Sequence, residues 1–124
     1  MNTYKIGQSV EQYACSFLEM QGLILISRNY RCYVGEIDLI MNDRDDFVFV
    51  EVRYRASLDY GHPVESIDTR KMKKLIRAAT HFLQVKKWLY TKNSRFDVVA
   101  LYPDKKAGSL TCDWIKHAFS VDQW

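Results

Sequence analysis

The sequence predicts one α/β domain in which a mixed β-sheet is flanked by helices. The chain has 124 residues, which is enough for one hydrophobic core and too few for two. Two segments show the apolar spacing of three and four residues that is typical of amphipathic helices. Five other segments show the short apolar or alternating pattern of strands, so the predicted order is α-β-β-β-α-β-β. Residues 1–124 are therefore interpreted as a single domain.

The first helix is predicted over residues 8–21, followed by a strand over residues 23–28. Gly22 between them is a typical helix stop. Cys15 lies beside the apolar stripe of the helix and is expected to be a small buried hydrophobe. The side chains that form this stripe are Val10, Tyr13, Ala14, Phe17 and Leu18.

A β-hairpin is predicted next, because residues 35–41 and 47–55 alternate on either side of a short polar stretch. A loop over residues 56–68 leads to a second helix, which Asp68 or Thr69 can cap at its N-terminus. The apolar stripe of this helix, which runs on toward Trp88, consists of Met72, Leu75, Ile76, Ala79, Phe82 and Leu83.

Two strands complete the predicted sheet, over residues 95–102 and 110–115, with a turn at Pro103-Asp104. A strand, a helix and another strand in succession require a right-handed crossover. The strand over residues 47–54 should therefore lie parallel to the strand over residues 95–102.

Composition excludes several classes of protein. No apolar run approaches the roughly 18 to 20 residues that span a bilayer, and no secretory signal precedes the first helix. The three cysteines share no metal-ligand spacing and cannot all pair with one another, so a cytoplasmic location is expected. The net charge of +3 is too small to identify a partner by itself.

Two carboxylates are predicted to meet across the hairpin. Because side chains alternate along a strand, Ile37, Leu39 and Met41 should share one face and Asp38 the other. Glu51 lies on the face of its own strand that carries no valine. If the apolar faces of the two strands coincide, Asp38 and Glu51 lie opposite one another or one diagonal apart.

Two like charges in contact call for a positive partner. A divalent cation prefers carboxylate oxygens, and Arg53, two residues after Glu51, offers a guanidinium. Glu36 on the same face is expected to pair with Arg53. Spacing alone favours a plain salt-bridge cluster made of Glu36, Asp38, Glu51, Arg53 and Arg55.

Several motifs together resemble the uncharacterised bacterial family called YraN. They are GEIDL at 35–39, FVEVR at 49–53, a Tyr60-Gly61 loop followed by a basic helix, and RFDVV at 95–99. The resemblance covers nearly the whole chain. That family is similar to archaeal-type Holliday junction resolvases, which are PD-(D/E)XK nucleases with a restriction-endonuclease-like fold.

The resemblance implies an endonuclease that binds Mg²⁺ or Mn²⁺ through Asp38 and Glu51 and acts as a homodimer on branched DNA. It further implies that Glu11 of the first helix and Arg53 belong to the catalytic set. From the residues alone, Glu11 is a solvated carboxylate at the edge of its helix.

The usual lysine of the PD-(D/E)XK motif is Arg53 in this chain. A guanidinium cannot accept a proton, although it can stabilise a transferring phosphate. Three functions therefore stay open: a metal-dependent nuclease, a nucleic-acid-binding module without turnover, and a protein-interaction scaffold.

A basic stripe along the second helix is the predicted nucleic-acid surface, to which Arg55 is added. The alternative is a solvated cationic face. The stripe consists of Arg70, Lys73, Lys74 and Arg77, with His81 on the same side. Aromatic side chains that could stack on unpaired bases or belong to the core are Tyr54, Tyr60, Trp88 and Tyr90. His62 is a further candidate for a hydrogen bond to phosphate.

Overall fold

The computed structural model describes residues 3–104, 106 and 108–119. The predicted order of elements is confirmed, with one additional 3₁₀ turn, η1, in the loop before the second helix. The elements are α1 (Thr3–Met20), β1 (Ile24–Cys32), β2 (Gly35–Asp43), β3 (Asp46–Tyr54), η1 (Pro63–Ser66), α2 (Thr69–Lys86), β4 (Asn93–Asp104) and β5 (Ser109–Phe119).

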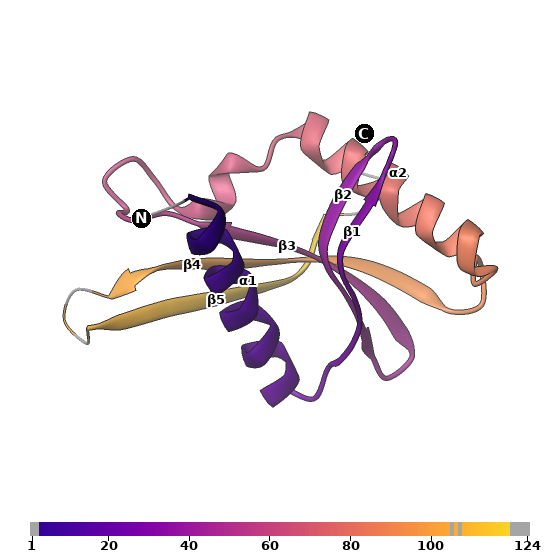
Figure 1. Ribbon diagram of the computed structural model, residues 1–124, viewed down its shortest axis with the longest axis horizontal. Coiled ribbons are helices and arrows are strands. Elements are labelled where there is room, and N and C mark those ends of the chain that lie inside the picture. The colour runs from indigo at the N-terminus through magenta and orange to yellow at the C-terminus, as the bar shows by residue number, and fades with distance from the viewer. Residues whose placement is uncertain (1–2, 105, 107, 120–124) are drawn as a thin grey trace.

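The five strands form one mixed sheet in the order β1-β2-β3-β4-β5. Neighbouring strands are antiparallel except for β3 and β4, which are parallel and joined through α2, as the crossover rule predicts. The sheet is strongly twisted, because β1 and β2 run steeply across the direction of β4 and β5 (Figure 1).

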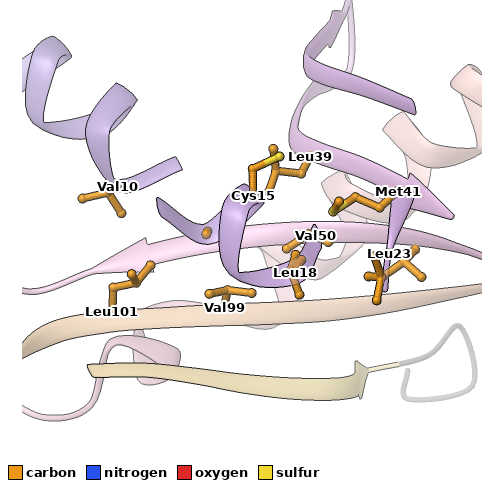
Figure 2. Packing of buried hydrophobic residues seen from close by; sticks show 11 residues of the cluster. Val10, Cys15, Leu18, Leu23, Leu39, Met41, Val50, Val99 and Leu101 are labelled. Atoms are coloured by element: carbon orange, nitrogen blue, oxygen red, sulfur yellow. The ribbon is translucent and has the colours of Figure 1, made fainter. Parts of the chain in front are cut away.

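One face of the sheet packs against α1. Leu18 of α1 meets Leu39, Val50 and Val99 in this layer, which Figure 2 shows from close by. Cys15 is buried there, as predicted. Tyr13 was predicted to belong to the apolar stripe of this helix, but 42% of it is exposed and it lies outside the core.

The second layer lies between the sheet and α2, which crosses behind the β1–β2 hairpin (Figure 1). The predicted cap of this helix is confirmed, since the carboxylate of Asp68 accepts a hydrogen bond of 2.9 Å from the Lys71 N–H. Ile37 is a second correction: it packs in this layer with Ile40, and not with Leu39.

The simple alternation of β2 fails at Asp38. On β1, the residue between the partners of Leu39 and Ile37 is Asn29, which has a positive φ of 48°. This local twist lets Ile37 turn toward α2 while Leu39 faces α1.

Most strands extend beyond their predicted ends, and α1 begins at Thr3 and not at residue 8. β1 continues to Cys32, β5 continues to Phe119, and Pro103 belongs to β4 and not to a turn. The pairing of β4 with β3 ends at Leu101, and beyond it β4 pairs with β5 alone. A proline, which has no N–H, is tolerated there because one edge of the strand is free. Neither helix of the described chain has the apolar length needed to cross a bilayer.

Candidate carboxylate site

Asp38 and Glu51 lie where two strands separate. The β2–β3 ladder runs from the Asp43–Asp46 pair to the Leu39–Val50 pair. Asp38 and Glu51 are the next residues on the two strands. Past this point β3 stays paired with β4 only. The Val52 N–H, released from the ladder, donates a 2.8 Å hydrogen bond to Oδ2 of Asp38. The register that brings the two carboxylates together is therefore the predicted one.

A cavity of about 380 Å³ opens at this fork between the strands. Four elements line it: α1 contributes Glu11, β2 contributes Asp38, β3 contributes Glu51 and Arg53, and α2 contributes Lys71. The predicted catalytic residues thus lie around one cavity, because the N-terminal parts of both helices meet the open end of the hairpin.

The carboxyl groups of this cavity are buried close together, and only 7% of Asp38 and 5% of Glu51 are exposed. Burial, followed by the charge of Asp38, raises the pKa of Glu51 to about 7. Burial also raises the pKa of Asp38, against the hydrogen bond from Val52. The pKa of Glu11 rises to about 7 through burial, the charge of Asp38 and a hydrogen bond with it. Full ionisation therefore needs additional positive charge.

Two cations face Glu51. Nη2 of Arg53 lies 3.2 Å from Oε1 of Glu51, and Nζ of Lys71 lies 3.7 Å from the same oxygen. The Nε of Arg53 is buried without a hydrogen-bond partner among the described residues. Arg53 therefore holds one buried donor that the described residues leave unsatisfied.

Lys71 is the residue that sequence reasoning missed. Lys71 lies three residues before Lys74, at the edge of the basic stripe, but it is partly buried whereas the cations of the stripe are exposed. The signal that could have found it is the cap, because Asp68 binds the Lys71 N–H and so fixes Lys71 in the first turn after the crossover from β3.

Glu36 does not pair with Arg53, contrary to prediction. Its carboxylate lies 3.1 Å from Nε of Arg31. The β1–β2 register places Arg31 and Glu36 directly opposite one another, so the neighbouring strand provides the partner. Glu36 still lines the edge of the carboxylate cavity.

The donor set suits a small hard cation bound through few protein ligands. Carboxylate oxygens are the ligands that Mg²⁺ prefers, and Mg²⁺ commonly uses one or two carboxylates and keeps several waters. Asp38 and Glu51 supply such a pair. Among the residues that the structure describes, no group of three or more His, Cys, Asp or Glu side chains is arranged to hold a metal ion. The residues thus fit an open two-carboxylate site and not a closed cage.

The four cations predicted to bind phosphate are exposed along α2. Arg70 directly precedes Lys71 of the cavity, and Lys73, Lys74 and Arg77 follow along the helix. Arg55 is partly buried, and its Nη1 donates a 2.9 Å hydrogen bond to the Tyr60 carbonyl oxygen. Arg55 therefore holds the loop after β3.

The histidines have structural partners. Nδ1 of His62 accepts a hydrogen bond from the Val64 N–H, which leaves Nε2 to donate to Asp113 at 2.8 Å. His62 thus fastens the loop to β5. Both of its ring nitrogens have partners within the protein, whereas a hydrogen bond to phosphate was predicted. Nδ1 of His81 contacts the Tyr30 hydroxyl at 2.5 Å.

The aromatic candidates separate into two groups. Trp88 stacks on Phe47 at the edge of the core. Tyr54, Tyr60 and Tyr90 are exposed, and of these Tyr54 lines the carboxylate cavity.

The RFDVV motif forms a separate ionic network at the opposite end of β3. Arg95 lies 2.8 Å from the Asp43 carboxylate, 3.3 Å from that of Asp46 and 3.1 Å from that of Asp97. Asp97 is buried and also accepts a 2.9 Å hydrogen bond from the Trp114 indole. This motif fixes the β2–β3 turn to β4 and does not reach the carboxylate cavity.

The fold and the site together define an α/β domain that holds a buried acidic pair, faced by two cations, at a fork in its sheet. The model of the uncharacterised protein family UPF0102 matches residues 10–101, and the chain belongs to this family. The matched range includes every residue named above at the carboxylate site. The family membership expected from the sequence motifs is thereby confirmed.

The similarity to other members of the family extends over almost the full chain. A UPF0102 protein of Nitrosococcus oceani is 45% identical over 116 residues, which cover 94% of this chain and 92% of the relative. One from Pseudomonas putida is 48% identical over 115 residues, which cover 93% of this chain and 92% of the relative. One from Coxiella burnetii is 42% identical over 120 residues, covering 97% and 96%.

Proposed function

We propose that this protein is an endonuclease-like enzyme that uses Mg²⁺ or Mn²⁺ to hydrolyse phosphodiester bonds in branched DNA. The observation that carries the proposal is the pair of buried carboxylates, Asp38 and Glu51, held in one open cavity with two cations. Their raised pKa values are those of groups that a cation would stabilise in the charged form. The resemblance to resolvases supports branched DNA as substrate and a homodimer as the active form.

Each residue of the cavity has a separate role in this proposal. Asp38 and Glu51 would hold the metal ion, which supplies an activated water and a Lewis acid when bound. Arg53 keeps its proton at any useful pH, so it stabilises negative charge on the phosphate and does not act as a base. Lys71 adds a second positive charge on the side of the cavity formed by α2. Glu11 forms a hydrogen bond with Asp38 beside the metal-binding pair, and burial and the charge of Asp38 raise the pKa of Glu11.

A second candidate function is nucleic-acid binding without turnover. The ion pair between Arg53 and Glu51 favours it, because that pair already gives Glu51 a positive partner. The exposed cations of α2 would serve either function, since phosphate contacts need only placed positive charge.

Calorimetric titration with Mn²⁺, together with a cleavage assay on a four-way DNA junction, tests the proposal. We expect one weak metal site that is lost in Asp38→Asn and in Glu51→Gln, with cleavage lost in parallel. Asp45→Asn is the matched control, because Asp45 is an exposed carboxylate in the β2–β3 turn. Equal Mn²⁺ binding by all four proteins contradicts the metal site. Mn²⁺ binding without cleavage by the wild type supports the second function.

A further inference from the structure

The carboxylate cavity continues into a groove between α1 and β1. Two further cavities, of about 170 and 470 Å³, follow it along these elements. Glu11 lines all three cavities, and Glu36 lines the first two. Asn29 lines the second and the third. Because neighbouring cavities share these lining residues, we treat the three as one depression that leads away from Asp38 and Glu51.

The far end of this depression is lined mainly by neutral hydrogen-bonding side chains. We call this end the α1/β1 groove and define it by Gln8, Ser9, Gln12, Arg28 and Asn29. Arg31, which lines the connecting cavity, is neutralised by its ion pair with Glu36. The groove thus differs in chemistry from the exposed cationic stripe of α2.

These two surfaces suit different parts of a nucleic acid. Clustered cations bind the phosphate backbone of a duplex. Amide side chains form hydrogen bonds with the edges of bases, which are accessible in full only when the strand is unpaired. Tyr54 at the carboxylate end, with 38% of its surface exposed, offers a ring on which an unpaired base can stack.

We propose that the α1/β1 groove binds the unpaired strand of a DNA molecule whose duplex portion lies on α2. The scissile phosphate would then lie at the carboxylate cavity, between the two surfaces. The inference rests on the proposed function and narrows its substrate class to a duplex with a single-stranded tail.

The test compares the affinity for two fluorescent DNA probes, measured by anisotropy without divalent metal. One probe is a blunt duplex, and the other is the same duplex with a single-stranded tail. The variant is Gln12→Ala/Arg28→Ala, and the matched control is Gln84→Ala/Lys86→Ala. The control removes one amide and one positive charge from exposed positions near the end of α2, away from the groove.

We expect the wild type and the control to bind the tailed probe at least about fivefold more tightly than the blunt duplex. This is the lower end of the effect that one good base contact has on affinity. The groove variant should lose this preference and keep its affinity for the blunt duplex. Equal binding of both probes by the wild type overturns the inference, and so does a variant that weakens both probes by the same factor.

Failure of the groove and failure of the proposed function give different results. A wild type that cleaves the junction with Mn²⁺ but shows no tail preference retains the function without the groove. A wild type that prefers the tail but never cleaves retains the groove without the enzymatic activity. A wild type that binds neither probe and does not cleave the junction with Mn²⁺ contradicts both.

Discussion

Arg53 limits the chemistry that can be proposed for the carboxylate site. Its guanidinium contacts Glu51 through Nη2, while its buried Nε lacks a partner in the described chain. A side chain of this type offers planar donors to a phosphate and cannot remove a proton from water. The proposed reaction therefore needs positive charge from Arg53, and Lys71 is the neighbouring group that offers the same charge.

Substitution of Arg53 tests this role. Arg53→Ala should lower metal-dependent cleavage by on the order of 100-fold, the usual effect of deleting one transition-state donor. Arg53→Lys should keep or raise the rate, because it retains the charge at the same position. Cleavage rates on junction DNA with Mn²⁺ are compared, and a denaturant melt of each variant checks that it is folded. A wild-type rate in Arg53→Ala would contradict a catalytic role for this residue.

Alternation along the strands is enough to place Asp38 and Glu51 together. It could not place Ile37 correctly, since the positive φ of Asn29 on the neighbouring strand interrupts the regular pattern. The ion pair of Glu36 also depends on the neighbouring strand, because the β1–β2 register supplies Arg31. Contacts between side chains of two strands depend on the register of those strands. The residue pattern of one strand does not give this register.

The basic stripe of α2 predicts how DNA affinity depends on salt. If its exposed cations contact phosphates, each neutralised contact contributes about 0.9 to the negative slope of log affinity against log salt. Lys73→Ala/Lys74→Ala should therefore bind duplex DNA more weakly, with a slope that is shallower by about 1.8. Affinities measured at several salt concentrations give the slope. Lys106→Ala/Lys116→Ala is the control, since it removes the same charge from exposed positions outside α2.

A slope in Lys73→Ala/Lys74→Ala equal to that of the wild type would show that the stripe only faces solvent. A slope that falls equally in the control would show a general effect of net charge and no specific surface.

Elements were easier to predict than their ends. The apolar periodicity of α2 and its Asp68 cap fix that helix locally, so its start agrees with the structure. The extension of β1 to Cys32 depends on pairing with β2. The sequence predicts no contact between the loop before α2 and β5, although His62 and Asp113, far apart in sequence, hold them together.

The burial of the acidic cluster makes the stability of the whole molecule depend on pH. The pKa of Glu51 rises from an ordinary value of 4.5 to about 7 on folding, and that of Glu11 does the same. Between these pH values the folded state binds more protons than the unfolded state, so stability falls as the pH rises. We expect the free energy of unfolding, measured in EDTA, to fall by on the order of a few kcal/mol between about pH 5 and 7.5. Most of this change comes from Glu51, because Glu11 is only partly buried and solvent screens its charge.

Glu51→Gln should make this pH dependence weaker, because it removes one titrating group and its repulsion of Asp38. Urea melts of both proteins across this pH range measure the difference. Parallel pH profiles for the wild type and Glu51→Gln would contradict the assignment of the effect to the carboxylate site.

The strand order of the sheet has a consequence for how the chain folds. Each strand is adjacent in space to the one that precedes it in sequence, so most pairings close over short turns. The exception is the parallel β3–β4 pairing, which joins Asp46 to Asn93 across the whole of α2. Topology therefore predicts that hairpins form early and that this one long-range closure limits the folding rate. The two carboxylates belong to a hairpin that forms locally, whereas Lys71 reaches them only with the late crossover.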